Sequence, residues 1–262
     1  PETNSMETSV KPVSRQNELS LGLLVPLNFT RGDNYRLADI RLGYHYTAVN
    51  DLGSDATDGS YRLGSVSGQA SYTQYRKKAY QNITTPLGFG LELTTRQSVT
   101  DIKAFQFQAI ADFAVRGLTA NHNLIISTGY KQEPDKNRYQ FSDLFIYPRG
   151  YYIPRYNRMF TWQSAYHFPI AYPDFGFWGI FYCTRIRASV FADYGYASLP
   201  SGVYLNSTQQ LGSTGAEIIF DTQWMNITHI PIGFRFTRLL SRDPVDPTRK
   251  TLFECIIPVL RL

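Results

Sequence analysis

Apolar residues occupy every second position through most of this chain, and that alternation limits its fold more than any other feature. Between Leu19 and Phe29, apolar residues alternate largely with polar residues or glycine. A period of two places the apolar side chains of an extended strand on one face. About eleven segments show the pattern: 19–29, 40–46, 61–75, 87–93, 105–113, 124–130, 162–170, 180–193, 216–221, 230–237 and 251–262. The sequence therefore predicts an all-β protein.

The composition favours strands that cross a membrane. Aromatic residues make up 15% of the chain, whereas charged residues make up only 18%. This mixture is typical of amphipathic membrane strands, because half of their residues face lipid and half face water. No apolar run reaches the roughly 18 residues that a transmembrane helix requires, so a helical span is not expected.

We expect residues 17–262 to form a transmembrane antiparallel up-and-down β-barrel, with residues 1–16 as a disordered lead or linker. Short turns on one side of the predicted strands and long polar loops on the other fit a meander. Lipid cannot hydrogen-bond an open sheet edge, so membrane strands must close on themselves or on a partner. Bacterial single-chain barrels normally have an even number of strands. The odd count therefore leaves two alternatives: the count of segments is off by one, or these strands are part of a larger barrel, such as one of 16 strands, with further strands on the N-terminal side.

One long loop interrupts the strands. Residues 141–160, FSDLFIYPRGYYIPRYNRMF, are rich in both aromatic residues and arginines. A loop with so many rings would aggregate if it extended into water, so we expect it to fold back into the lumen of the barrel. Arg149, at the centre of this loop, would then need an acidic partner, because an unpaired buried charge is costly.

Strand parity predicts which polar side chains meet this loop. Along residues 180–193, apolar side chains share one face and charged side chains share the other. If the apolar face meets lipid, the charged face points into the lumen. The same reasoning applies to the neighbouring strands. The polar side chains expected to line the lumen are His167, Arg185, Arg187, Asp193 and Glu217.

Two short motifs and their order resemble a known superfamily. The motif Arg149-Gly150-Tyr151 lies in the long loop, and Phe191-Ala192-Asp193-Tyr194-Gly195 lies on the second predicted strand after it. About five predicted strands follow the loop. This arrangement resembles the C-terminal part of the BamA-type superfamily of outer-membrane insertases and translocases, which includes the two-partner secretion transporters. The resemblance covers roughly residues 85–262.

The resemblance implies a specific contact inside the barrel. In that superfamily the loop arginine bonds to the acid of the strand motif, which here pairs Arg149 with Asp193. A guanidinium that is held by a carboxylate fixes a loop that would otherwise move. His167 stands where an acid would strengthen the arginine site, so Asp193 is the partner that the resemblance predicts. The implied clamp and strand-motif residues are Arg149, Gly150, Tyr151, Phe191, Asp193 and Gly195.

The same resemblance implies a non-enzymatic protein of the bacterial (Gram-negative) outer membrane that acts in protein translocation or insertion, or as the membrane subunit of a larger complex. Its partners would be outer-membrane lipid or lipopolysaccharide, and other protein subunits or client proteins. No POTRA modules precede the strands in this sequence, which leaves a second hypothesis: a barrel that anchors a soluble domain or partner without transport activity. A third hypothesis, a soluble all-β sandwich, predicts purification without detergent.

The sequence contains no recognisable catalytic or cofactor motif. Its four histidines lack an HExxH spacing, its serines lack a GxSxG elbow, and Gly88-Phe89-Gly90 lacks the remainder of a dinucleotide fingerprint. We therefore expect no catalytic site, no metal and no cofactor. The net charge of +5 is scattered along the chain rather than gathered in a patch, so no nucleic-acid partner is expected.

Overall fold

The computed structural model describes residues 14–51, 61–78, 82–119, 121–134, 139, 141–142, 145–152, 156–198, 208–225 and 227–258. Within them lies a single antiparallel sheet of twelve strands. The strands are β1 (Ser14–Asn28), β2 (Asn34–Asp51), β3 (Tyr61–Arg76), β4 (Leu87–Ser98), β5 (Phe105–Arg116), β6 (Asn123–Gln132), β7 (Arg158–Ala171), β8 (Phe175–Phe177), β9 (Phe181–Ser198), β10 (Thr208–Trp224), β11 (Thr228–Leu239) and β12 (Thr251–Ile256).

The sheet is an up-and-down meander. Eleven strands pair with their neighbours in chain order, and the short β8 pairs only with β9. The eleven alternating segments of the sequence match the eleven strands of this path, which confirms the all-β prediction. The expected lead of residues 1–16 falls partly outside the described residues, and β1 already begins at Ser14. No helix of the described part of the chain is long and apolar enough to span a membrane.

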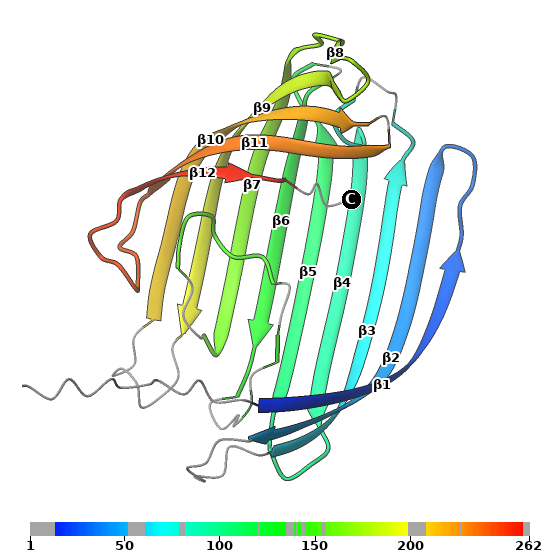
Figure 1. Ribbon diagram of the computed structural model, residues 1–262, viewed down its shortest axis with the longest axis vertical. Helices are drawn as coiled ribbons and strands as arrows, with labels where there is room; N and C mark the ends of the chain where they lie inside the picture. Colours follow the sequence, from blue (N-terminus) through cyan, green and yellow to red (C-terminus); the bar gives the residue numbers. More distant parts are fainter. Residues whose placement is uncertain are drawn as a thin grey trace, which may run out of the picture.

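The residues Pro173-Asp174-Phe175-Gly176 are typical of a turn in the sequence. The structure differs, because Phe175–Phe177 forms β8 and makes a hairpin with the start of β9. The turn comes after these residues, where Trp178 and Gly179 both have positive φ angles. The hairpin therefore projects beyond the other strands at this end of the sheet, as Figure 1 shows.

The sheet is strongly curved, and the chain between β6 and β7 lies on its concave side (Figure 1). On the opposite, convex face, large apolar side chains are exposed: Leu19 is 67% exposed, Leu21 76% and Leu23 62%. The apolar surface extends onto β2, because Leu21 is opposite Tyr44 and Leu23 is opposite Leu42. The concave face instead buries charged and polar side chains, including Lys131, Glu133, Arg187 and Asp193.

The larger of two clusters of buried apolar side chains in the described residues lies between the β6–β7 loop and the concave face. In this cluster, rings from the loop meet residues of the strands. Its members are Ile110, Phe145, Ile146, Tyr151, Tyr156, Met159, Ala197, Leu211 and Leu239. Burial of this surface favours the folded position of the loop, since apolar area removed from water contributes about 25 cal/mol per Å².

A β-bulge reverses the faces to which the side chains at the start of β9 point. Asp221 of β10 is opposite Arg185, but the next residue, Thr222, is opposite Cys183, so Thr184 has no counterpart. Before this bulge Phe181 lies opposite Trp224, on the same face of β10 as Ile218. Because of the bulge, the ring of Phe181 and the β8 residues paired with the start of β9 lie on the convex apolar face.

Candidate functional site

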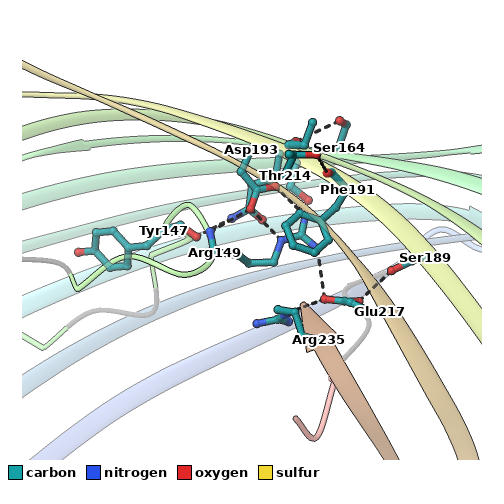
Figure 2. Close-up of polar contacts among 12 residues, drawn as sticks. Tyr147, Arg149, Ser164, Ser189, Phe191, Asp193, Thr214, Glu217 and Arg235 are labelled. Atoms are coloured by element: carbon teal, nitrogen blue, oxygen red, sulfur yellow. Dashed lines mark hydrogen bonds and ion pairs between the residues drawn. The ribbon is translucent and has the colours of Figure 1, made fainter. Parts of the chain in front are cut away.

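Arg149 of the β6–β7 loop and Asp193 of β9 meet on the concave face of the sheet (Figure 2). The guanidinium donates from Nε to Oδ2 over 2.8 Å and from Nη2 to Oδ1 over 2.7 Å, and the backbone N–H of Arg149 donates to Oδ2 over 2.9 Å. The Asp193 side chain is fully buried. Two parallel charge-assisted bonds fix the orientation of the arginine as well as its position. The contact that the resemblance predicted is therefore present.

The other two residues of the strand motif face the same loop. The guanidinium carbon of Arg149 lies 3.8 Å from the centre of the Phe191 ring, a cation–π contact. A Cβ atom added to Gly195 would lie 2.8 Å from Cγ of Pro148. Because Phe191, Asp193 and Gly195 are two residues apart, all three point to the concave face. In this motif, the Phe191 ring stacks on the guanidinium, Asp193 binds it, and Gly195 leaves room for Pro148.

Gly150 and Tyr151 hold the loop in place after the arginine. Gly150 has a φ of 86°, which favours glycine, and a Cβ atom there would lie 2.6 Å from Cγ2 of Thr237. The Tyr151 hydroxyl donates to the carbonyl oxygen of Gly212 over 2.5 Å and accepts from the N–H of Gly212 over 3.0 Å. Each residue of the Arg-Gly-Tyr motif therefore has its own contact with the sheet.

A second acid, Glu217 of β10, also approaches the loop arginine. Its Oε1 lies 3.5 Å from Nη1 of Arg149 and 2.6 Å from Nε of Arg235, and its Oε2 accepts from Ser189 over 2.9 Å (Figure 2). The resemblance predicted Asp193 as the partner of the arginine and treated Glu217 only as a lumen residue. The signal that could have identified it is register, since Glu217 lies directly opposite Arg235 on β11 and Ser189 on β9.

Arg185 and Arg187 share a third acid, Asp221. Nη2 of Arg185 lies 2.6 Å from Oδ2 of Asp221, and Nε of Arg187 lies 3.0 Å from Oδ1. His167 is 4% exposed on the same face, where it lines a cavity of about 430 Å³ together with Arg149 and Arg187. The residues that parity placed on the concave face therefore lie there, but they form more than one group.

A further set of contacts connects the loop to the turn between β11 and β12. The carboxylate of Asp243 accepts hydrogen bonds from the N–H groups of Tyr152, Val245 and Asp246, over 3.2, 2.8 and 3.0 Å, and it also binds Arg249. Arg249 in turn donates to the carbonyl oxygen of Gly150 over 2.7 Å and lies 3.8 Å from the centre of the Tyr152 ring. Sequence reasoning missed this group because residues 240–250 show no alternation.

The environment of Asp243 shifts its pKa. Burial of the side chain acts to raise the pKa, but the hydrogen bonds from the N–H of Asp246, from Arg249 and from the N–H groups of Val245 and Tyr152 outweigh it. The pKa of Asp243 is therefore lower than that of an ordinary aspartate. The charged form holds the two loops together, since only a carboxylate can accept this many hydrogen bonds.

A buried ion pair supports the other end of the loop. Lys131 Nζ lies 3.0 Å from Oε1 of Glu133, and both side chains are at most 2% exposed. Gln106 donates to the same carboxylate oxygen over 2.9 Å, and Lys131 donates to the hydroxyl of Tyr147 over 3.3 Å. A buried pair with additional hydrogen bonds fixes geometry more than it adds stability. The β6–β7 loop is therefore held by charged groups on both sides of Arg149.

Searches with the sequence found no matching protein-family model and no matching curated protein. In the described part of the chain, no group of three or more His, Cys, Asp or Glu side chains is placed to hold a metal ion. The arrangement that remains is a curved sheet with one loop on its concave side. Three carboxylates bind this loop: Asp193 and Glu217 of the strands, and Asp243 of the turn between β11 and β12.

Proposed function

We propose that this chain is an outer-membrane β-barrel protein of the BamA-like superfamily, which acts in protein translocation or insertion or as the membrane subunit of an outer-membrane complex. One observation carries the proposal: the convex face exposes apolar side chains along the sheet while the concave face buries ionic groups. A soluble domain has the opposite arrangement, because water drives apolar side chains inward. Lipid around the sheet and water inside it would favour the arrangement seen here.

Closure of the sheet into a barrel belongs to the same proposal. Among the described residues, β1 and β12 each pair with only one neighbouring strand. In a bilayer, the unpaired N–H and C=O groups of such edges would each cost several kcal/mol. We infer that the edges pair with each other or with further strands, in a barrel of even strand number.

The proposed role of the β6–β7 loop is to occupy the lumen and control access through it. The contacts of Arg149 with Asp193 and Glu217 support this role, as does the resemblance of the two motifs to the superfamily. A loop that is held through an arginine and two acids can be released only if those charges find other partners. The proposal therefore predicts two states of the loop, bound and released.

Tryptophan fluorescence tests the membrane location. Trp162 of β7 is 38% exposed and lies opposite Tyr194, on the convex face. A variant with Trp162 as its only tryptophan, made by Trp178→Phe and Trp224→Phe, is reconstituted into liposomes. We expect lipids with brominated acyl chains to quench its emission and aqueous iodide to leave it unchanged. Quenching by iodide but not by brominated lipid would contradict the proposal.

Activity is tested in the same liposomes. We expect the wild-type protein to accelerate the insertion of a urea-unfolded outer-membrane barrel client, compared with protein-free liposomes. Arg149→Lys, which keeps the charge but cannot form two parallel bonds to a carboxylate, should lower this rate. A rate equal to that of protein-free liposomes would remove the insertion role while leaving the membrane location untouched.

The second candidate function is an anchor that holds a soluble domain or partner at the membrane without transport. The number of contacts on the loop favours it, because Arg149, Tyr151 and Tyr152 are each bound to a different part of the sheet or its turns. An anchor predicts that Trp162 is quenched by lipid and that client insertion is not accelerated.

A further inference from the structure

A cavity of about 500 Å³ lies between strands β1–β4 and the start of the β6–β7 loop, and it shares no lining residue with the cavity beside Arg149. Its volume is typical of sites that hold small organic ligands. Gly22 and Gly43 are paired across β1 and β2 and both line the cavity, so no side chain fills the space above the backbone there. Tyr139 and Phe141 of the loop form one wall.

The strands present hydroxyl groups to this cavity. Thr47, Ser65 and Thr94 all line it, and none of the three makes a side-chain hydrogen bond among the described residues. Ser67 and His45 add a polar pair, with Oγ 3.2 Å from Nε2. Because a hydroxyl group both donates and accepts hydrogen bonds, this lining complements a ligand that is itself rich in hydroxyl groups.

Arg96 of β4 adds a positive charge to the cavity. It is half-buried, its Nη1 donates to the carbonyl oxygen of Ser142, and it forms no ion pair with the described residues. The other arginine of the lining, Arg41, lies 3.6 Å from Asp39, so its charge already has a partner. No Asp or Glu of the described chain lines the cavity. A guanidinium binds a carboxylate through parallel hydrogen bonds, so Arg96 favours a ligand with one negative charge.

The loop side of the cavity is aromatic. The rings of Tyr139 and Phe141 lie 5.3 Å apart, and they pack with the buried Leu63 of β3. Phe141 is buried, whereas Tyr139 is only half-buried. An aromatic ring beside polar groups suits a ligand that has one apolar face, such as the C–H face of a sugar ring, because the two surfaces gain dispersion energy in contact.

We propose that this cavity binds an acidic sugar, a pyranose ring that carries a carboxylate, as uronic acids do. The hydroxyl groups of Thr47, Ser65 and Thr94 bind the hydroxyl groups of the sugar, Arg96 binds its carboxylate, and Tyr139 covers its C–H face. Each part of the ligand is thus matched by a different part of the lining: hydroxyl-bearing strands, one cation and one aromatic wall.

Calorimetric titration of the purified full chain tests the site, in a detergent whose headgroup is not a sugar. The probes are D-glucuronate and D-glucose, which differ only in the carboxylate. We expect glucuronate to bind about tenfold more tightly than glucose. Arg96→Gln should remove this difference by weakening glucuronate binding alone, because it takes away one charge-assisted contact. Arg62→Gln is the control, since Arg62 is exposed on β3 and does not line the cavity.

A second variant tests the hydroxyl groups without a change of charge. Thr94→Val replaces a hydroxyl that has no hydrogen bond among the described residues, so this variant should fold normally. We expect it to weaken the binding of glucuronate about three- to tenfold, the loss of one hydrogen bond. Thr95→Val is the matched control, because Thr95 is the adjacent residue, is exposed on the other face of the sheet and does not line the cavity.

Three results would overturn the proposal: no binding of glucuronate, equal affinity of the wild-type protein for the two sugars, or equal losses in Thr94→Val and Thr95→Val. None of them depends on whether the chain inserts client proteins, so the sugar site and the proposed function are tested separately.

Discussion

Asp193 receives three hydrogen bonds from one residue, Arg149, which lies 44 positions earlier in the chain: two from its guanidinium and one from its own backbone N–H. The carboxylate therefore fixes the main chain of the loop as well as the side chain. Substitution of the acid would release both at once, which distinguishes this pair from an ordinary ion pair between two long side chains.

We expect Asp193→Ala to lower the free energy of unfolding by about 3–5 kcal/mol, because it leaves the Arg149 charge buried without its main partner. Urea unfolding in detergent, followed by tryptophan fluorescence, measures the change. The control is Asp39→Ala: Asp39 and Arg41 are separated by 3.6 Å and are 31% and 54% exposed, and exposed pairs contribute at most about 1 kcal/mol. Equal losses of unfolding free energy in both variants would show that the Arg149–Asp193 pair stabilises the protein no more than an exposed ion pair does.

Gly195→Ala should destabilise the protein by about 1–3 kcal/mol, as expected for overpacking of a well-packed site. The added methyl group would lie 2.8 Å from Cγ of Pro148, so the loop would have to move away from β9. Gly22→Ala is the matched control within another strand, because a Cβ atom there meets nothing closer than 3.4 Å. Limited proteolysis of the β6–β7 loop should separate the two variants; identical digestion rates would contradict the packing argument.

Asp243 makes part of the stability dependent on pH. Its pKa is lower in the folded protein than in an unfolded chain, so its contribution is complete above the unfolded value of about 4 and is lost as the pH falls through the folded value. We expect stability to be unaffected by this group between pH 7 and pH 5, and to decline below about pH 4. Unfolding midpoints measured against pH should show a weaker acid dependence in Asp243→Asn. An unchanged profile in this variant would assign the acid sensitivity to other carboxylates.

Trp178 gives a test of how far lipid contact extends. This side chain is 86% exposed and stacks on Phe177, with ring centres 5.5 Å apart. Tryptophan is enriched at the interface between bilayer and water. With Trp178 as the only tryptophan, we expect quenching by lipids that carry a spin label near the headgroup, and weaker quenching by labels deep in the acyl chains. Quenching by iodide alone would place the hairpin in water.

The strands could be predicted from the sequence because their physical cause is local. Alternation along Leu19 to Phe29 is visible within a single strand, and the same is true of the other long strands. The three-residue β8 is too short to show a period, and Pro173 and Asp174 before it are typical of turns. Only its pairing with β9 makes it a strand.

Of the contacts in the site, only the one between the two sequence motifs could be predicted. Arg149 and Asp193 belong to such motifs, and parity placed Asp193 on the inner face. Glu217 depends on the register between β10 and β11, and Asp243 on a contact between two loops that lie 91 residues apart at Tyr152. Neither register nor loop contact follows from a single sequence. Glu217 was therefore expected only as a lumen residue, and its contact with Arg149 and the whole Asp243 group were found only in the structure.

Thr184, the residue at the bulge of β9 that has no counterpart on β10, sets the face to which the side chains at the start of β9 point. Deleting this one residue would restore a uniform pleat, and the ring of Phe181, with the β8 residues paired with it, would then lie on the concave face beside Arg185. The number of residues at this position therefore matters more than which residue occupies it.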